Sequence, residues 1–273
     1  MIAGIVRPAR RPPGWLAPGP APLTPTREDV WPREGEDLCY LAGDWRILQR
    51  TGGHRFSLDD LVTAHFASRM ARPERLLDLG CGIGSVLLFL AWRFPSARCL
   101  GVEAQTVSAG MARRSVAWNG VEDRVEVRLG DFREVAVEGG FDLISGTPPY
   151  FPRGTGTESD SVQKGPCRFE HRGGVEDYCL RAAPLLKPGA PFVGCAPSLQ
   201  GERVREAARA AGLWVERWRE VVPRAGKAPL ISLFSMKREK VEMVVEEPLV
   251  VRDARSRRTE EFVALRAEMG MPP

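Results

Sequence analysis

Short apolar runs alternate with amphipathic stretches through the middle of the chain. Four runs have the length of a strand, and the segments between them have the spacing of helices or the glycine and aspartate residues of turns. Strands that alternate with helices are typical of βαβ units, in which neighbouring strands run parallel. The pattern therefore predicts an α/β protein with strands at Leu76–Leu79, Arg98–Val102, Val125–Leu129 and Phe141–Ile144.

Helices and a second group of strands follow from the same patterns. Ser57 and Asp60 have the spacing of a capping box, which predicts that a helix begins at Leu58. Two long runs near the C-terminus predict an antiparallel pair that closes the sheet. The predicted helices are Leu58–Arg69, Val175–Leu186, Glu202–Ala211 and Thr259–Met269, and the further strands are Phe192–Ala196, Leu213–Val222 and Leu230–Met236.

A glycine-rich turn follows the first predicted strand. Asp78 lies near the end of the strand, and Gly80, Gly82 and Gly84 follow in the spacing G-x-G-x-G. Glycine allows a tight turn and lets a ligand approach the backbone closely. A dinucleotide-binding turn is usually G-x-G-x-x-G and directs a helix N-terminus at phosphate. A carboxylate at the turn favours a cationic amino-acid ligand instead.

Two further strand ends carry groups that suit the rest of a nucleoside ligand. Glu103 follows the second strand about 20 residues after the glycines, where an acid that binds ribose hydroxyls is expected. Asp131 and Phe132 follow the third strand and offer an acceptor and an apolar ring to an adenine. An isolated glycine turn is common in α/β proteins, but acids at three strand ends together match the ammonium, ribose and adenine of S-adenosylmethionine.

The fourth predicted strand leads to Thr147-Pro148-Pro149-Tyr150, the candidate catalytic segment. An exocyclic amine of a base or a carboxamide is a poor nucleophile, so acceptors must draw its nitrogen toward tetrahedral geometry. The side chain of Thr147 and the carbonyl of Pro148 can supply them, in a backbone that the prolines stiffen. We expect Tyr150 to stack on the planar substrate. In isolation the tetrapeptide would indicate a rigid turn with a packed tyrosine.

Beyond these motifs, the chain resembles the bacterial valine-tRNA adenine-N6 methyltransferases, which methylate the exocyclic amine of an anticodon-loop adenine. The resemblance covers most of residues 36–270 and is not limited to the cofactor turn and the Pro-Pro-Tyr segment. The additional stretches are Glu36-Asp37-Leu38-Cys39-Tyr40-Leu41, Trp45-Arg46-Ile47-Leu48-Gln49, Phe56-Ser57-Leu58-Asp59-Asp60-Leu61-Val62, Cys167-Arg168-Phe169-Glu170, Pro223-Arg224-Ala225-Gly226-Lys227 and Pro248-Leu249-Val250-Val251.

The resemblance implies a Rossmann-like class I methyltransferase with a seven-stranded, mostly parallel sheet and a C-terminal antiparallel hairpin. It implies S-adenosylmethionine as cofactor, tRNA as partner, and Phe56 and Asp59 as cofactor contacts, although Asp59 also suits a helix first turn, where the dipole favours an acid. The chain departs from the family at Thr147, where the family has Asn, and at Phe169, where it commonly has His. Threonine offers a hydroxyl but no amide carbonyl to the amine.

Basic residues occur in two segments close to these motifs. Residues 151–174 are polar, glycine-rich and too long for a simple connection, which predicts a substrate loop. A second basic loop separates the last two predicted strands. Cationic side chains can hold RNA phosphates while a target base is flipped out, although solvated surface charge explains part of such a set. The candidate RNA contacts are Arg153, Lys164, Arg168, Arg172, Arg224 and Lys227.

Composition agrees with a single enzyme domain. The 273 residues, 43% of them hydrophobic, can bury one α/β core, which predicts a domain over 35–273 with its lead-in at 35–72. Residues 1–34 are rich in Pro and Arg and predict an extended or flexible arm. Without a bilayer-spanning run or a secretion signal, we expect a cytoplasmic protein. The dispersed histidines and cysteines indicate no metal, and the net charge of +4 agrees with a polyanionic partner without requiring one.

Two other functions remain open. Protein glutamine methyltransferases use a similar Pro-Pro-Tyr strand end, but their family has a helical recognition domain before the cofactor fold, where this chain has only about 70 residues. A non-catalytic relative that binds the cofactor or RNA is the second, because Thr147 replaces the family's Asn. The intact set of Asp78, Glu103 and Asp131 argues against it. Methylation of an adenine N6 in tRNA is the leading prediction.

Overall fold

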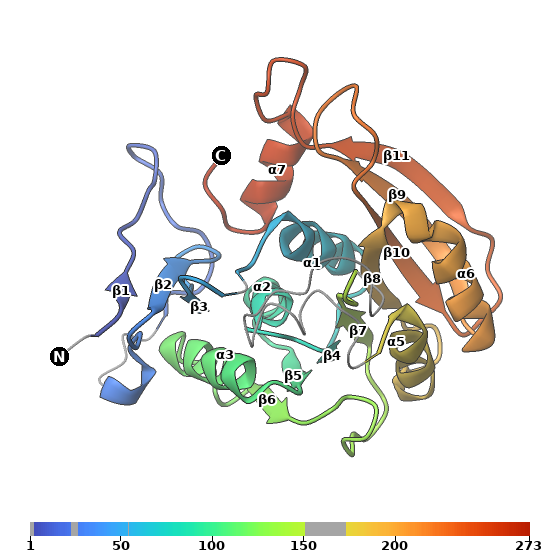
Figure 1. The fold of residues 1–273 in the computed structure, drawn as a ribbon, viewed down its shortest axis with the longest axis horizontal. Coiled ribbons are helices and arrows are strands. Elements are labelled where there is room, and N and C mark those ends of the chain that lie inside the picture. Colours follow the sequence, from blue (N-terminus) through green and yellow to red (C-terminus); the bar gives the residue numbers. More distant parts are fainter. Residues whose placement is uncertain (1–2, 23–26, 54, 151–172) are drawn as a thin grey trace.

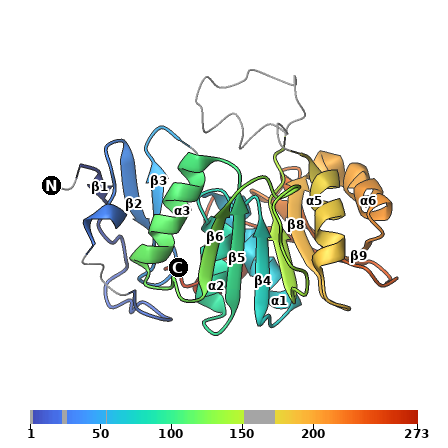
Figure 2. The ribbon, with the colours of Figure 1, turned by 90° about the horizontal axis from the view of Figure 1, so that it is seen from below.

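The computed structural model describes residues 3–22, 27–53, 55–150 and 173–273. Its centre is an eight-stranded sheet with the order β11-β9-β10-β8-β7-β4-β5-β6, and helices cover both of its faces (Figures 1 and 2). The five strands from β8 to β6 run parallel, β10 runs antiparallel to its two neighbours, and β11 runs parallel to β9. The strands are β4 (Arg75–Leu79), β5 (Arg98–Glu103), β6 (Val125–Leu129), β7 (Leu143–Gly146), β8 (Phe192–Pro197), β9 (Trp214–Val222), β10 (Ile231–Lys237) and β11 (Val244–Val250).

Two groups of helices pack on opposite faces of this sheet, and a small second sheet holds the N-terminal segments. The first group contacts strands from β10 across to β6, and the second contacts β8 and β9. The elements are α1 (Leu58–Met70), α2 (Ser85–Arg93) and α3 (Thr106–Trp118) on one face; α5 (Val175–Ala182) and α6 (Gly201–Ala210) on the other; α7 (Glu260–Glu268) beside α1 and β11; the 3-10 turns η1 (Glu28–Val30), η2 (Ala183–Leu185) and η3 (Ser198–Gln200); and strands β1 (Ile5–Val6), β2 (Glu36–Tyr40) and β3 (Arg46–Arg50).

Consecutive side chains of the parallel strands enter two different apolar cores. On β4, Leu76 joins the core under α1, α2 and α3, whereas Leu77 joins the core under α5 and α6. Val193 and Phe192 on β8 divide in the same way, and all four side chains are fully buried. A strand covered on both faces needs apolar residues at every position. This is why these strands occur in the sequence as continuous apolar runs.

The predicted class I methyltransferase fold is confirmed, with two differences in detail. The main sheet has an eighth strand, β11, beyond the seven that were expected. The predicted fourth strand, Phe141–Ile144, begins later, at Leu143, and continues to Gly146. Phe141 forms only an isolated bridge with Leu186, and the Asp142 carboxylate accepts hydrogen bonds from the backbone N–H groups of Glu74 and Arg75. Asp142 therefore caps the neighbouring strand before β7 begins.

Over its described residues, the opening segment contains β1 near its start and the 3-10 turn η1 near its end. β1 pairs in parallel with β2, and Arg11 lies 4.5 Å from the ring centroid of Tyr40 while its guanidinium pairs with Asp44 at 2.6 Å. These contacts attach the arm to the N-terminal sheet. The division of the chain at residue 34 stays a prediction.

Candidate functional site

Asp78 on β4 provides a buried carboxylate with one oxygen unpaired. The residue is 2% exposed, and its Oδ1 accepts a hydrogen bond from Ser145 Oγ on β7 at 2.8 Å. Asp78 Oδ2 has no hydrogen-bond partner among the described residues. Burial raises the pKa of Asp78 to about 7, against the effect of the Ser145 hydrogen bond. Because a buried polar atom without a partner costs free energy, this oxygen fits a ligand that brings a donor, such as an ammonium group.

The three glycines after β4 form a turn that only glycine can adopt without strain. Gly80, Gly82 and Gly84 have φ values of +61°, +57° and +86°, in the left-handed region. A Cβ on Gly80 would collide with the Tyr178 hydroxyl, whereas a Cβ on Gly82 would meet nothing within 4 Å. Tyr178 therefore packs against the turn at Gly80, whereas the turn has open space beside Gly82. Such a turn can lie against an amino-acid ligand.

Glu103 closes this turn from the end of β5. Its Oε2 accepts a hydrogen bond from the Gly82 N–H at 2.9 Å, and its Oε1 accepts one from the Gln105 N–H at 2.6 Å. A carboxylate oxygen can accept more than one hydrogen bond, so holding the turn does not exclude binding a diol. The position beside the turn fits the predicted contact with ribose hydroxyls.

Asp131 and Phe132 lie in the loop after β6, where the sequence predicts an adenine site. The carboxylate of Asp131 pairs with the Arg133 guanidinium, through contacts of 2.9 and 2.6 Å. Phe132 is buried, and its ring centroid lies 4.4 Å from that of Tyr178 on α5. Tyr178 also covers Gly80 and Gly146, so one ring connects the adenine candidate to the glycine turn and to β7. Tyr178 could not be identified from the sequence, because nothing local to α5 indicates this contact.

The first turn of α1 places two acids beside the same region. Asp60 forms the predicted capping box, in which its Oδ2 accepts the Ser57 N–H at 2.8 Å, and its Oδ1 accepts the Ser85 hydroxyl at 2.6 Å. Burial, followed by the charge of Asp59, raises the pKa of Asp60 well above its usual range. Asp78 contributes in the same direction. The sequence indicated Asp60 only as a cap, whereas the structure adds it to a buried acidic group.

The candidate catalytic segment begins directly after β7, next to the glycine turn. Leu79 pairs with Gly146 in the parallel register of β4 and β7, so Thr147 follows beside Gly80. Thr147 is half-buried and Pro148 is buried. Neither the Thr147 hydroxyl nor the Pro148 carbonyl accepts a hydrogen bond from a described residue.

Tyr150 is fixed at both its hydroxyl and its backbone. The hydroxyl donates to Asp59 Oδ2 at 2.8 Å and lies 3.3 Å from Cys195 Sγ, and the carbonyl accepts the Gln200 side-chain amide at 2.8 Å. Burial, and after it the nearby Cys195 and Asp59, raises the pKa of Tyr150 well above its usual value, so the hydroxyl stays a donor. Asp59, predicted as a cofactor contact, thus orients Tyr150. Gln200 is a further contact that the sequence did not indicate.

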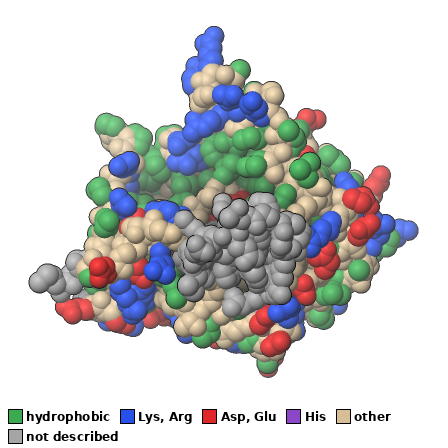
Figure 3. All heavy atoms as spheres, in the orientation of Figure 1, with side chains coloured by type: hydrophobic (Ala, Val, Ile, Leu, Met, Phe, Trp, Pro, Cys, Tyr) green, Lys and Arg blue, Asp and Glu red, His purple; other side chains and the backbone are tan. Residues whose placement is uncertain are grey.

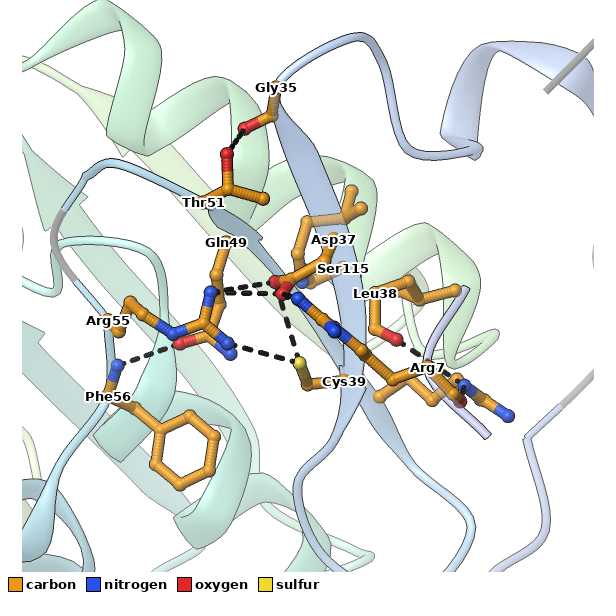
Figure 4. Close-up of polar contacts among 12 residues, drawn as sticks. Arg7, Gly35, Asp37, Leu38, Cys39, Gln49, Thr51, Arg55, Phe56 and Ser115 are labelled. Carbon is orange, nitrogen blue, oxygen red and sulfur yellow. Dashed lines mark hydrogen bonds and ion pairs between the residues drawn. The ribbon is translucent and has the colours of Figure 1, made fainter. Parts of the chain in front are cut away.

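The lead-in to α1 is held by an ion cluster around Asp37 on β2 (Figure 4). Asp37 is fully buried and pairs with Arg7 at 2.8 Å and with Arg55 at 3.0 Å, and Figure 4 shows the two guanidiniums reaching it from opposite sides. These arginines hold the pKa of Asp37 below its usual range although burial opposes them. Next to Arg55, the Phe56 N–H donates to Gln49 Oε1 at 2.9 Å, and its ring packs edge-on to Phe89. The cluster therefore fixes the segment that carries Phe56 and Asp59.

The predicted RNA contacts divide into two groups. Arg224 and Lys227 are exposed in the loop between β9 and β10. The other predicted contacts, together with the departure Phe169, lie outside the described residues: Arg153, Lys164, Arg168 and Arg172. In the part of the chain that the structure describes, no group of acids, histidines and cysteines could hold a metal ion. No helix there is both long and apolar enough to cross a membrane.

The chain is similar to known methyltransferases in sequence and in fold. Residues 55–164 match the family model of the methyltransferase small domain. A tRNA1(Val) (adenine(37)-N6)-methyltransferase of Bacteroides thetaiotaomicron is 31% identical over 198 residues, which cover 71% of this chain and 81% of that protein. The enzyme of the same name from Tolumonas auensis is 30% identical with the same coverage.

The fold is also similar to that of a solved structure with low sequence identity. A solved structure described as a predicted O-methyltransferase from Agrobacterium tumefaciens has a TM-score of 0.60 at 19% identity, and the match covers 78% of this chain and 98% of that one. At this identity the match shows the fold alone. The sequence matches carry the family assignment: this chain belongs to the tRNA1(Val) (adenine(37)-N6)-methyltransferase family.

Proposed function

We propose that this protein transfers a methyl group from S-adenosylmethionine to the N6 amine of an adenine in tRNA. Adenine 37 of tRNA1(Val), the substrate in the names of its relatives, is the first candidate. The observation that carries the proposal is the adjacency of the unpaired Asp78 carboxylate oxygen on β4 and the Thr147 segment after β7. A site for a cation and a site for an amine thus lie on neighbouring strands.

The residues at the ends of β4 and β5 fit the cofactor. Asp78 would bind its ammonium group, Glu103 its ribose hydroxyls, and the turn from Gly80 to Gly84 would lie along its amino-acid part. When bound, S-adenosylmethionine supplies an electrophilic methyl group on a sulfonium. The buried acids also favour the positive charge of this ligand over a phosphate-bearing dinucleotide, since like charges in a buried site repel.

Thr147 and Pro148 would orient the substrate amine. Hydrogen bonds from the amine to the Thr147 hydroxyl and the Pro148 carbonyl draw the nitrogen toward tetrahedral geometry and direct its lone pair at the methyl donor. Such fixed acceptors stabilise the transition state without reorganising. Tyr150, held by Asp59 and Gln200, would stack on the adenine. A tRNA substrate also implies that the protein acts in the cytoplasm.

Methyl transfer from labelled S-adenosylmethionine to separate pools of tRNA, protein and small molecules tests the proposal. We expect label in tRNA, recovered as N6-methyladenosine after nucleoside digestion. Label in protein glutamine would support the other methyltransferase class instead. Cofactor binding without label in any pool would contradict catalysis and favour a binding protein.

Two substitutions at Tyr150 test whether the methyl transfer takes place at this site. Tyr150→Ala removes the stacking ring, a contact worth about 1–3 kcal/mol, and should lower methyl transfer by about tenfold or more while cofactor affinity is retained. Tyr150→Phe keeps the ring and removes only the hydrogen bond to Asp59, and should lose less. Full activity of Tyr150→Ala would contradict the stacking role.

A further inference from the structure

Two neighbouring loops form a basic surface at the edge of the sheet that carries the proposed active site. Residues 223–230 connect β9 to β10, and residues 251–258 follow β11. Val222 pairs with Val250, and Ile231 pairs with both Val221 and Pro197, so both loops emerge beside the carboxyl end of β8. We call them the basic double loop, whose cationic residues are Arg224, Lys227, Arg252, Arg255, Arg257 and Arg258.

The basic double loop is held by its own hydrogen bonds. The Ala225 N–H donates to the Arg252 carbonyl at 2.8 Å and so joins the two loops. Within the second loop, the Asp253 N–H donates to the Arg257 carbonyl at 2.8 Å, and Ser256 adopts a left-handed φ of 64°. A surface that is already ordered loses little conformational entropy when it binds a partner. The double loop therefore presents its charges in a fixed arrangement.

Positive charge dominates this surface. Asp253 is the acid within the two loops, and it pairs with Arg257 at 2.9 Å. The side chains of Lys227, Arg255 and Arg258 are exposed and make no hydrogen bond or ion pair with a described residue. In Figure 3, Lys and Arg side chains gather along a projection at the top of the view, where Figure 1 shows the loops after β9 and β11.

The position of the double loop suits a long polyanion. In the strand order, β9 lies three strands and β11 four strands from β7. At about 4.8 Å between strands, the loops lie roughly 14–19 Å from the strand that leads to Thr147. A small substrate bound at Thr147 would not reach them, whereas the phosphates of a folded RNA extend over such distances.

We propose that the basic double loop binds the phosphate backbone of the RNA whose base is methylated beside Thr147. Guanidinium and ammonium groups make charge-assisted hydrogen bonds to phosphate, and these contacts position a nucleic acid without reading its sequence. The inference rests on the proposed function, and it adds Arg252, Arg255, Arg257 and Arg258 to the contacts that the sequence predicted.

Filter binding of an unmodified tRNA1(Val) transcript, over a range of KCl concentrations, tests the inference with two triple variants of the full chain. The first, Lys227→Gln with Arg255→Gln and Arg258→Gln, removes three charges that support no described contact. The matched control removes three exposed charges from the opposite, amino edge of the sheet, at Arg98, Arg238 and Lys240. Binding of S-adenosylmethionine serves as the measure of folding.

The double-loop variant should bind the transcript at least about tenfold more weakly than the wild type. The slope of log Kd against log salt should fall by about 2–3, since each lost phosphate contact removes about 0.7–0.9. The control should bind like the wild type. Equal weakening in both variants would overturn the inference in favour of overall charge.

Two further outcomes separate the inference from the proposed function. Wild-type affinity in the double-loop variant, with methylation of tRNA intact, would overturn the inference alone. Neither binding nor methylation of tRNA by the wild type, with cofactor binding retained, would overturn both.

Discussion

The carboxyl edge of the sheet has two chemically opposite regions. At β4 and β5 it presents acids that are almost fully buried, Asp78 and Glu103. After β9 and β11 it presents arginines and lysines that are exposed. The buried acids suit a compact ligand that brings its own positive charge. The exposed arginine and lysine side chains suit a polyanion that stays partly hydrated. If both proposals hold, substitutions in one region should change cofactor binding without changing RNA binding, and the reverse.

The same contrast explains why the RNA backbone would be kept away from the cofactor region. A phosphate near Asp78 and Glu103 would meet like charge in a site with little water, where repulsion is weakly screened. The basic double loop offers the favourable alternative at the other end of the edge. Only an uncharged base needs to reach the Thr147 segment, which lies between the two regions in the strand order.

The largest expected effect comes from a substitution in the acidic region, which should change cofactor binding alone. Asp78→Asn keeps the shape of the side chain but removes its charge, and should weaken S-adenosylmethionine binding by about 100-fold or more, because a buried charge partner is lost. Affinity for tRNA should be unchanged. Equilibrium dialysis with labelled cofactor and filter binding with tRNA measure the two properties.

Stability provides the control for this variant. Burial raises the pKa of Asp78 in the folded protein to about 7, whereas the same carboxyl in the unfolded chain ionises near its ordinary pKa of about 4. The free energy of unfolding of the free protein therefore falls as the pH rises from about 4 to about 7. Asparagine does not ionise and should not lower the melting temperature of the free protein at pH 8. A variant that binds the cofactor within a factor of three of the wild type would contradict the role of Asp78.

The second effect concerns the ion cluster around Asp37, which holds the lead-in to α1. Asp37→Asn leaves Arg7 and Arg55 without their shared carboxylate and should cost about 2–3 kcal/mol of unfolding free energy, the range for hydrogen bonds to charged groups. Both arginines are partly exposed and can turn to water, which limits the cost. Chemical denaturation measures it.

The matched control is Asp29→Asn, which removes a carboxylate from an exposed pair with Arg27. Exposed pairs contribute little, so we expect no measurable change in the unfolding midpoint. Equal effects of the two substitutions would show that the Asp37 cluster does not hold the lead-in.

A third, smaller effect sharpens the comparison through pH. Asp78 must be ionised to bind an ammonium group, and with a pKa of about 7 its ionised fraction rises about 16-fold from about pH 5.5 to about pH 7. Cofactor affinity should rise by a similar factor over this range, below the pH at which an α-amino group titrates. Arginine and lysine stay charged throughout, so binding of tRNA through the double loop should not change. Calorimetric titration with the cofactor measures the dependence, and a flat profile would contradict it.

Local sequence patterns predicted β5 and β6 more accurately than β11. β6 has the predicted bounds, because its alternating sequence buries Val125 and Val127 and exposes Glu126, and β5 differs by one residue. β11 was not predicted as a strand, since Glu246, Glu247 and Pro248 interrupt its apolar pattern. The interruption is tolerated because β11 is an edge strand, with an irregular register between Glu246 and Leu249.

In the candidate site, too, local sequence patterns predicted some residues and missed others. Asp78 and Glu103 could be placed from their spacing after strands, a property of the local chain. The contacts that orient the site join distant segments, such as Tyr150 to Asp59 and Tyr178 to Phe132. A single sequence carries no local signal for such pairs, so the structure was needed to find them.

The smallest expected effect lies where the two regions meet. Thr147→Asn adds an amide carbonyl at the position where the family has asparagine, and should raise kcat about threefold without changing the Kd for either cofactor or tRNA, because only the acceptor of the amine changes. Thr147→Val, of nearly the same shape as threonine, removes the acceptor and should lose most of the turnover. Steady-state methylation of the tRNA1(Val) transcript measures both. If Thr147→Val keeps wild-type turnover, the hydroxyl does not orient the amine, and the Pro148 carbonyl alone must do so.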